Sequence, residues 1–378
     1  MIRRGIGVVV VALAVLAGCA AAHAQPTPRV TLDVVVSPPA GLRPYHAGER
    51  GGLAVGADGT YYVLMSWYDE ADAARIELVA IGPGGGEKMR VPLPIRLPID
   101  SRGYAVQSMG VVVSRSGDLA VLVSGQGQTT LFRLGADGRI KKASEIAPPS
   151  RAARFGSDDY YQLRHYVATP DNALLLAGGY GSGPYSWWMG KFSLDGVRLW
   201  QQGPSRGWPD SVNGIRLRSD GSWIVILGEH SVENTKEDCF LDRYAADGRR
   251  LARTSIDYGG CYTAAVLAEG SVSARERRSP LPSKLIFRDD AGKATREVMW
   301  PFESTNWMIA DGPGLAAIVR PDPDSEAVVR ADASGRLRWK SPVVEKISDI
   351  ARTPDGQIAA LVWQAAPGEV RLVVYADP

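Results

Sequence analysis

The chain has 378 residues with 42 glycines, 25 prolines and 10 tryptophans, and its formal net charge is only +2. A balanced charge without a basic block excludes the electrostatic pattern of a nucleic-acid-binding protein, so we expect no nucleic-acid partner. A composition rich in turn formers and aromatic residues is typical of an all-β protein, and the length favours repeated units that each add core.

The first 18 residues predict an export signal. Arg3 and Arg4 precede residues 5–17, an uncharged apolar run that is short for a membrane-spanning helix and typical of a signal peptide. Residues 16–19 (LAGC) resemble a lipobox, so we expect cleavage before Cys19 and a lipid on that cysteine.

Residues 19–28 are then a tether, and the predicted location is the periplasm. The residue after Cys19 is Ala20 rather than the Asp that is typical of inner-membrane retention, which favours an outer-membrane anchor in a Gram-negative host. The protein would meet the membrane only through this lipid. An alternative site, residues 22–24 (AHA), would instead give a soluble secreted protein.

Strands and tight turns alternate along residues 29–378. Residues 29–36 alternate as a strand without a partner of its own. Two families of turn signals follow, such as Asp58-Gly59 between apolar runs and Asp137-Gly138 after alternating strands. Repeats of roughly 40–60 residues with four strands each predict propeller blades. The repeats begin near residues 50, 105, 162, 211, 261, 305 and 346.

We therefore predict an all-β fold with a single β-propeller of about seven four-stranded blades. The last repeat has room for three strands, so residues 29–36 are expected to supply the fourth and close the ring. Six or eight blades remain open as alternatives, because the repeat at residues 261–304 is irregular. The turn at Pro313-Gly314 is the least regular signal of the first family.

Polar and aromatic residues gather where blades begin and where second strands end. Because these positions share one face of a propeller, we expect a ligand-binding face there. The candidate residues are Tyr160, Arg164, His165, Trp187, Trp188, Trp208, Asp210, Asn213, His230, Asn306 and Trp307. The alternative interpretation is that the aromatic side chains pack the loops against one another.

Motifs for catalysis are scarce in this sequence. Asp158 and Asp159 with Arg164 and His165 could form an acid–base set, but neighbouring residues of a strand point to opposite faces. The four histidines show no zinc-ligand spacing, and the chain has no nucleophile elbow or phosphate-binding loop. We assign no catalytic residue, no metal site and no cofactor.

The remaining two cysteines, Cys239 and Cys261, are expected to form a disulfide. If Cys19 carries lipid, these two are left as a pair in an oxidising compartment. They lie near the start of the third strand of one blade and the first strand of the next, on one face. The alternative is two buried thiols.

Two repeats resemble those of the quinoprotein-like propellers. Residues 193–200 (SLDGVRLW) and 332–339 (DASGRLRW) each combine a turn with a short strand that ends in Trp. That superfamily includes pyrroloquinoline-quinone dehydrogenases and the lipoprotein scaffold of the outer-membrane β-barrel assembly machinery. The resemblance implies a propeller fold and leaves the chemistry open.

These observations favour a non-catalytic cell-envelope propeller that binds an envelope protein or peptide on its loop face. One alternative is a periplasmic enzyme of quinoprotein or glycan-cleaving type, which a bound chromophore or glycan turnover would reveal. Another is a carbohydrate-binding module, with a glycan as its ligand.

Overall fold

The computed structural model describes residues 26–44, 52–69, 73–98, 106, 108–125, 128–146, 161–180, 186–203, 211–230, 237–258, 263–275, 283–364 and 369–378. Within these ranges every helix or strand is a β-strand. No helix long and apolar enough to cross a membrane is found in the same ranges.

The strands group into seven antiparallel sheets, which are the blades. Blade one contains β2 (Arg43–Pro44), β3 (Leu53–Val55), β4 (Tyr61–Tyr68), β5 (Ala73–Ile81) and β6 (Glu87–Pro98). Blade two contains β7 (Ser108–Val113), β8 (Leu119–Gly125), β9 (Gln128–Leu134) and β10 (Ile140–Ile146). Blade three contains β11 (Tyr161–Ala168), β12 (Ala173–Tyr180), β13 (Ser186–Ser193) and β14 (Arg198–Gln202). Blade four contains β15 (Ser211–Leu217), β16 (Trp223–His230), β17 (Glu237–Tyr244) and β18 (Arg250–Tyr258).

Three further blades complete the set. Blade five contains β19 (Thr263–Val266), β20 (Ser271–Arg275), β21 (Lys284–Arg288) and β22 (Ala294–Met299). Blade six contains β23 (Ser304–Asp311), β24 (Gly314–Asp322), β25 (Ser325–Ala331) and β26 (Leu337–Lys340). Blade seven contains β27 (Lys346–Arg352), β28 (Ile358–Gln364), β29 (Glu369–Ala376) and β1 (Arg29–Val36).

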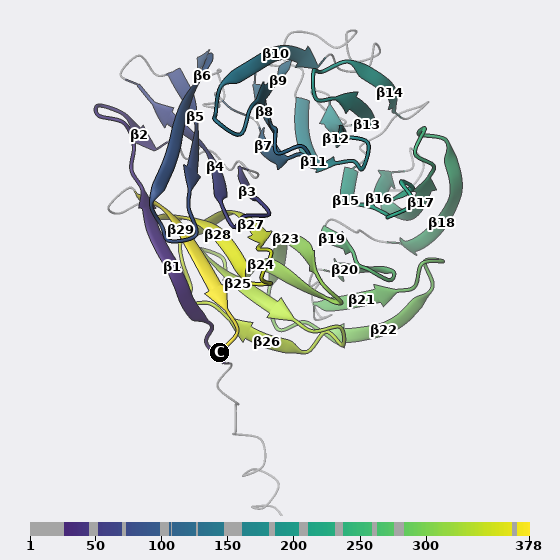
Figure 1. Cartoon of the computed structure of the whole chain (residues 1–378). Helices are drawn as coiled ribbons and strands as arrows, with labels where there is room; N and C mark the ends of the chain where they lie inside the picture. The colour runs from purple at the N-terminus through teal and green to yellow at the C-terminus, as the bar shows by residue number, and fades with distance from the viewer. Residues whose placement is uncertain are drawn as a thin grey trace, which may run out of the picture.

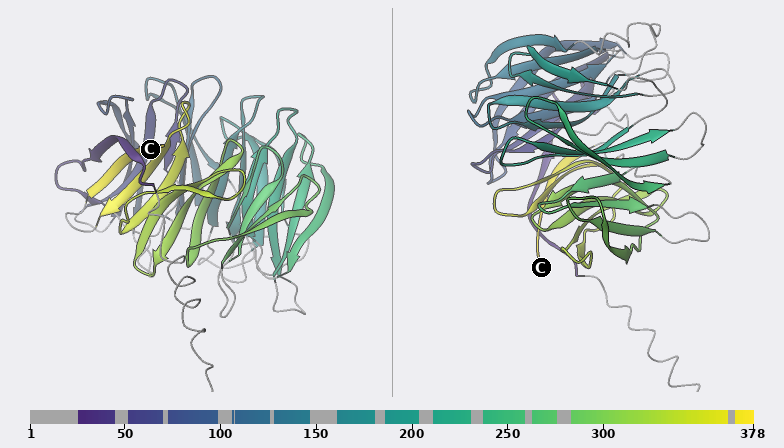
Figure 2. Two further views of the ribbon diagram at one scale, coloured as in Figure 1. Left: turned by 90° about the horizontal axis from the view of Figure 1, so that it is seen from below. Right: turned by 90° about the vertical axis from the view of Figure 1, so that its right-hand side faces the viewer.

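The blades form a closed ring (Figure 1). Their inner strands contact one another in the circular order β3, β7, β11, β15, β19, β23, β27 and back to β3. Seen from the side, the ring is a disc whose strands run from one face to the other (Figure 2). The prediction of a seven-bladed propeller is confirmed, and the inner strands begin close to the expected positions.

The N-terminal strand closes the ring as the sequence predicts. Residues Arg29 to Val36 of β1 pair antiparallel with Ala376 to Val370 of β29. The side chain of Val36 is buried in the core between blades seven and one. The edge of β29 is therefore covered by the other end of the same chain, which removes an open sheet edge.

Apolar packing between neighbouring blades forms the core. Seven clusters of buried side chains occur in the described residues, one for each interface of the ring. The second strands supply much of this core, and β8 is buried along its whole length. Their continuous apolar runs follow from burial on both sheet faces.

Tight turns mark one end of the blades, which we call the turn face. Gly117 and Gly138 adopt the positive φ that the Asp-Gly-type signals predict, and Asn172 takes this conformation with φ 60°. The turn expected at Pro313-Gly314 lies earlier in the chain, as the positive φ of Gly312 shows. The opposite end, where the inner strands begin, is the loop face.

Candidate functional site

Four inner strands carry a β-bulge near their loop-face ends. Their pairing with the second strand shifts at Arg164 in β11, Asn213 in β15, Asn306 in β23 and Ser348 in β27. We call these four the bulge residues, and all of them are polar. Because a bulge leaves one residue outside the ladder and re-aims its neighbours, four at one level form a specific polar feature around the axis.

The bulge in β11 changes how its side chains are distributed. Leu163 and Tyr166 both pack toward blade two, whereas His165 reaches blade four and approaches the carbonyl oxygen of Val212 with its Nε2 at 3.0 Å. Arg164 is exposed. The simple alternation expected for neighbouring residues therefore fails here, because the extra residue shifts the register.

His165 and Trp307 meet across the axis of the ring. Their rings stack with centroids 5.2 Å apart and planes 18° from parallel. They come from the inner strands of blades three and six, which are not neighbours in the ring. Two residues that the sequence predicted for the binding face are thus in direct contact.

His165 is held in its neutral form by this environment. Burial lowers its pKa to about 4, and the charge of Arg164 acts in the same direction, while the hydrogen bond with Val212 partly opposes the shift. Because this imidazole is weakly basic and stacks on an indole, a structural role for His165 is favoured over proton transfer near neutral pH.

Tyr166, the next residue along β11, reaches from blade three toward blades two and one. A Cβ atom on Gly110 of β7 would lie 2.6 Å from its ring, so only glycine allows the ring to pass there. The hydroxyl bonds with the backbone of Gly52, next to blade one. Burial and the nearby charge of Asp349 raise the pKa of Tyr166 well above its ordinary value, with the Gly52 bond opposing.

Two buried carboxylates join neighbouring inner strands. Asp349 of β27 accepts a hydrogen bond of 3.0 Å from the backbone N–H of Leu53 in blade one. Glu326 accepts bonds of 2.6 Å from Asn306 Nδ2 and from the backbone N–H of Ile347. These contacts use backbone groups at the inner edges, and they position the bulge residue Asn306.

Two of the predicted ligand residues are corrected by the structure. Trp187 and Trp188 lie in strand β13, and successive residues of a strand face opposite sides. Trp187 packs between blades three and four, and Trp188 packs between blades two and three against the edge of Phe192. Neither indole therefore faces a ligand surface.

The other candidates divide into described and undescribed groups. Asn213 is buried and Asn306 is half-buried. Outside the described residues lie Asp158, Asp159, Tyr160, Trp208, Asp210, Cys19 and Cys261, together with the side chain of His230. Cys239 is buried and belongs to the cluster between blades four and five.

Acidic, histidine and cysteine side chains do not gather into a metal site in the described parts of the chain. Those parts contain no group of three such residues placed to hold a metal ion. The carboxylates of Asp349 and Glu326 are instead bonded to backbone N–H groups of inner-strand residues.

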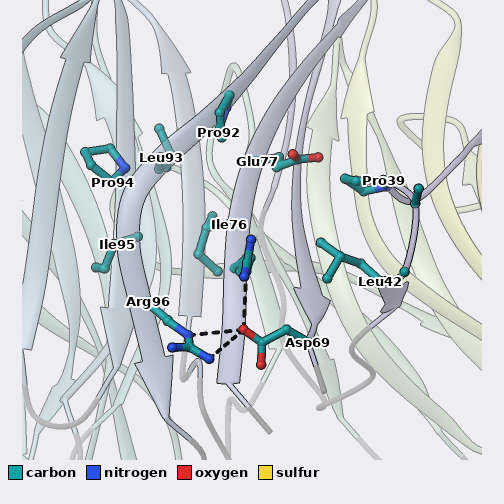
Figure 3. Close-up of a pocket in the computed structure, with 13 residues that line it drawn as sticks. Pro39, Leu42, Asp69, Ile76, Glu77, Pro92, Leu93, Pro94, Ile95 and Arg96 are labelled. Atoms are coloured by element: carbon teal, nitrogen blue, oxygen red, sulfur yellow. Dashed lines mark hydrogen bonds and ion pairs between the residues drawn. The ribbon is translucent and has the colours of Figure 1, made fainter. Parts of the chain in front are cut away.

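A second feature, which sequence reasoning missed, is a cleft in blade one. It has a volume of about 730 Å³ and is bordered by segment 39–42 and strands β5 and β6. Figure 3 shows Leu93, Pro94 and Ile95 on one side, Leu42 on the other, and Asp69 at one end. Alternating prolines in residues 91–98 (VPLPIRLP) are a signal that could have found it, because proline cannot donate to a ladder.

Comparison with known proteins shows the fold alone. No protein-family model and no curated protein sequence matches the chain. A catalytically inactive variant of virginiamycin B lyase from Staphylococcus aureus, solved with quinupristin, is 14% identical with a TM-score of 0.56, over 91% of this chain and 98% of that chain. The WD40 repeats of RRP9 are 10% identical with a TM-score of 0.57, over 93% and 100% of the two chains. The Dos1 propeller is 9% identical with a TM-score of 0.53, over 92% of each. The chain therefore has the β-propeller fold that these proteins share.

Proposed function

We propose that this protein is a non-catalytic binding propeller of the cell envelope, which holds a protein or peptide partner on its loop face. The observation that carries the proposal is the set of four polar bulge residues at one level around the axis. An exposed arginine beside half-buried aromatic rings is the kind of group that anchors protein interfaces. The propeller fold of the structural neighbours is compatible with such a role.

The axial chemistry favours binding over catalysis. The ring of His165 is stacked and its pKa is about 4, so it is a poor general base near neutral pH. The carboxylates of Asp349 and Glu326 already accept backbone hydrogen bonds.

Site-specific photo-crosslinking in living cells tests the loop face. A photoreactive phenylalanine analogue at Arg164, which is exposed on that face, should give a discrete adduct with one envelope protein. The same analogue at Ala136, exposed in a tight turn of the opposite face, serves as the matched control. Identical adducts at both positions, or none at Arg164, would contradict the proposal.

We also propose that the chain is exported and anchored to the outer membrane by lipid on Cys19. The support comes from the signal-like residues 1–18 and the lipobox-like residues 16–19. Replacing Cys19→Ala should move the protein from the membrane fraction to the periplasmic fraction, because the acyl chains supply the anchoring energy. If wild type and variant fractionate alike, the lipid anchor is wrong.

The disulfide between Cys239 and Cys261 stays part of this proposal. Cys239 faces the interface between blades four and five, the side on which blade five begins. A bridge there would staple these two blades in an oxidising compartment. Peptide mapping without reduction should recover the two cysteines in one cross-linked fragment, and recovery as separate thiols would reject the pairing.

A further inference from the structure

The cleft in blade one exists because the pairing of β5 and β6 is interrupted. Arg75 pairs with Arg96 and Glu77 pairs with Pro92, so the segment Leu93–Ile95 of β6 faces the single residue Ile76 of β5. Three residues against one push the two strands apart. The interruption is open toward segment 39–42, which forms the facing wall.

Two arginines converge at one end of this cleft. Arg75 Nε lies 3.2 Å from Asp69 Oδ2, and Arg96 reaches the same oxygen with Nε at 3.1 Å and Nη2 at 2.8 Å (Figure 3). Asp69 is 8% exposed and also accepts the backbone N–H of Ala73, so it is a fixed positioning residue. The two arginine side chains remain 56% and 54% exposed.

Among the described residues at this end of the cleft, positive charge exceeds negative charge, because the guanidinium groups of Arg75 and Arg96 share the single carboxylate of Asp69. The other carboxylate of the cleft, Glu77, is bonded to Trp67 Nε1 at 2.9 Å and to Arg90 at 3.0 Å. One further carboxylate would therefore balance Arg75 and Arg96, and each guanidinium has donors beyond those that Asp69 uses.

The walls beside the arginine pair are apolar. The exposed Pro94 and the half-buried Ile95 line one side, and the half-buried Pro39 and Leu42 line the other, whereas Leu93 is buried and packs into the core between blades one and two. The volume lies within the range of sites that bind a small ligand or a few residues of a peptide. The prolines of β6 also prevent a partner strand from pairing along that edge, so recognition falls to side chains.

We propose that this cleft binds an extended peptide segment that carries one acidic side chain between apolar neighbours. The acidic side chain bonds to the paired guanidinium groups of Arg75 and Arg96. Its apolar neighbours contact segment 39–42 on one side and the accessible surfaces of Pro94 and Ile95 on the other. This site lies on blade one, apart from the bulge residues, so its test is independent of the loop-face partner.

Calorimetric titration of the purified full mature chain tests this assignment. The probes are three amidated peptides, Gly-Leu-Glu-Leu-Gly, the same peptide with Gln at its centre, and the same peptide with Lys there. The Glu peptide should bind at least about tenfold more tightly than the Gln peptide, since charge-assisted hydrogen bonds are the stronger ones. The Lys peptide should not bind, and a rising salt concentration should weaken binding of the Glu peptide.

Variants locate the binding in the cleft. Replacing Arg96→Gln or Arg75→Gln singly leaves one guanidinium on Asp69. Either variant should weaken binding of the Glu peptide at least about fivefold, without changing the affinity for the Gln peptide. Arg250→Gln is the matched control, because Arg250 is 50% exposed and lies 3.7 Å from the buried Asp242 in blade four. It should leave binding unchanged.

Several outcomes would overturn the proposal. These are equal affinity for the Glu and Gln peptides, loss of binding in Arg250→Gln, or no binding of the Glu peptide at millimolar concentration. N-acetylglutamate serves as a small-molecule probe. If it binds as tightly as the peptide, the site recognises a free acid and the peptide assignment is wrong.

Discussion

At the scale of single residues, the axis of the ring is organised by groups that link distant blades. His165 belongs to blade three, donates from Nε2 to the carbonyl oxygen of Val212 in blade four and stacks on Trp307 of blade six. Tyr166 reaches past Gly110 toward Gly52. These side chains place aromatic rings in the axial region, where a ligand of the loop face would meet them.

The burial of His165 predicts a pH dependence of stability. Its pKa is about 4 in the folded chain and near 6.5 when unfolded, so between these values the unfolded chain binds a proton that the folded chain does not. The contribution of neutral His165 to the free energy of unfolding is complete above pH 6.5. It falls by about 3 kcal/mol as the pH drops to 4, at about 1.4 kcal/mol per pKa unit.

Urea unfolding of wild type and of His165→Gln between pH 7.5 and 4 measures this contribution. The difference in unfolding free energy between the two proteins should shrink as the pH falls, because carboxylates titrate in both and cancel. Parallel curves across the range would show that His165 does not keep this low pKa.

At the scale of elements, interruptions of the strand ladders mark the candidate sites. The bulges of β11, β15, β23 and β27 place polar residues around the axis, and the interruption of β6 opens the cleft of blade one. A regular inner strand would instead alternate its side chains between the interfaces with its two neighbouring blades. The irregular positions are therefore where side chains are left for recognition.

The strands themselves were predictable, whereas the bulges were not. The continuous apolar run of β8 and the turn at Gly117 follow from local rules of burial and backbone conformation. A one-residue register shift at Arg164 has no local signature, because any polar residue near a strand end fits the pattern. Trp187 and Trp188 were misplaced for a related reason, since strand β13 begins before them.

At the scale of the whole molecule, closure of the ring joins the two ends of the chain. Strand β1 completes blade seven, and the bond from Leu53 N–H to Asp349 joins blade seven to blade one. No blade can bury both faces alone, so each depends on its two neighbours. A ring in which every interface is filled should therefore unfold as one cooperative unit.

Removing β1 tests this closure. A chain that begins at Pro38 should lose at least about 3 kcal/mol of unfolding free energy compared with a chain that begins at Pro26, since burial of one valine such as Val36 contributes about 1.5–3 kcal/mol. It should also dimerise or aggregate through the bare edge of β29. Urea unfolding and light scattering measure the two effects. A monomer with unchanged stability would contradict the role assigned to β1.

The sequence by itself determined the all-β class and closure by the N-terminal strand, and it favoured seven blades, whereas the closed ring excluded six or eight. Each of these rests on local rules: glycine or asparagine at positive φ in the turns, apolar runs in strands buried on both faces, and a last repeat that lacks one strand. The stack of His165 on Trp307 and the pairing of Arg75 with Arg96 on Asp69 were decided only by the tertiary structure. Such contacts depend on strand register and on the curvature of the ring, and both arise from packing between blades rather than from any local stretch of sequence.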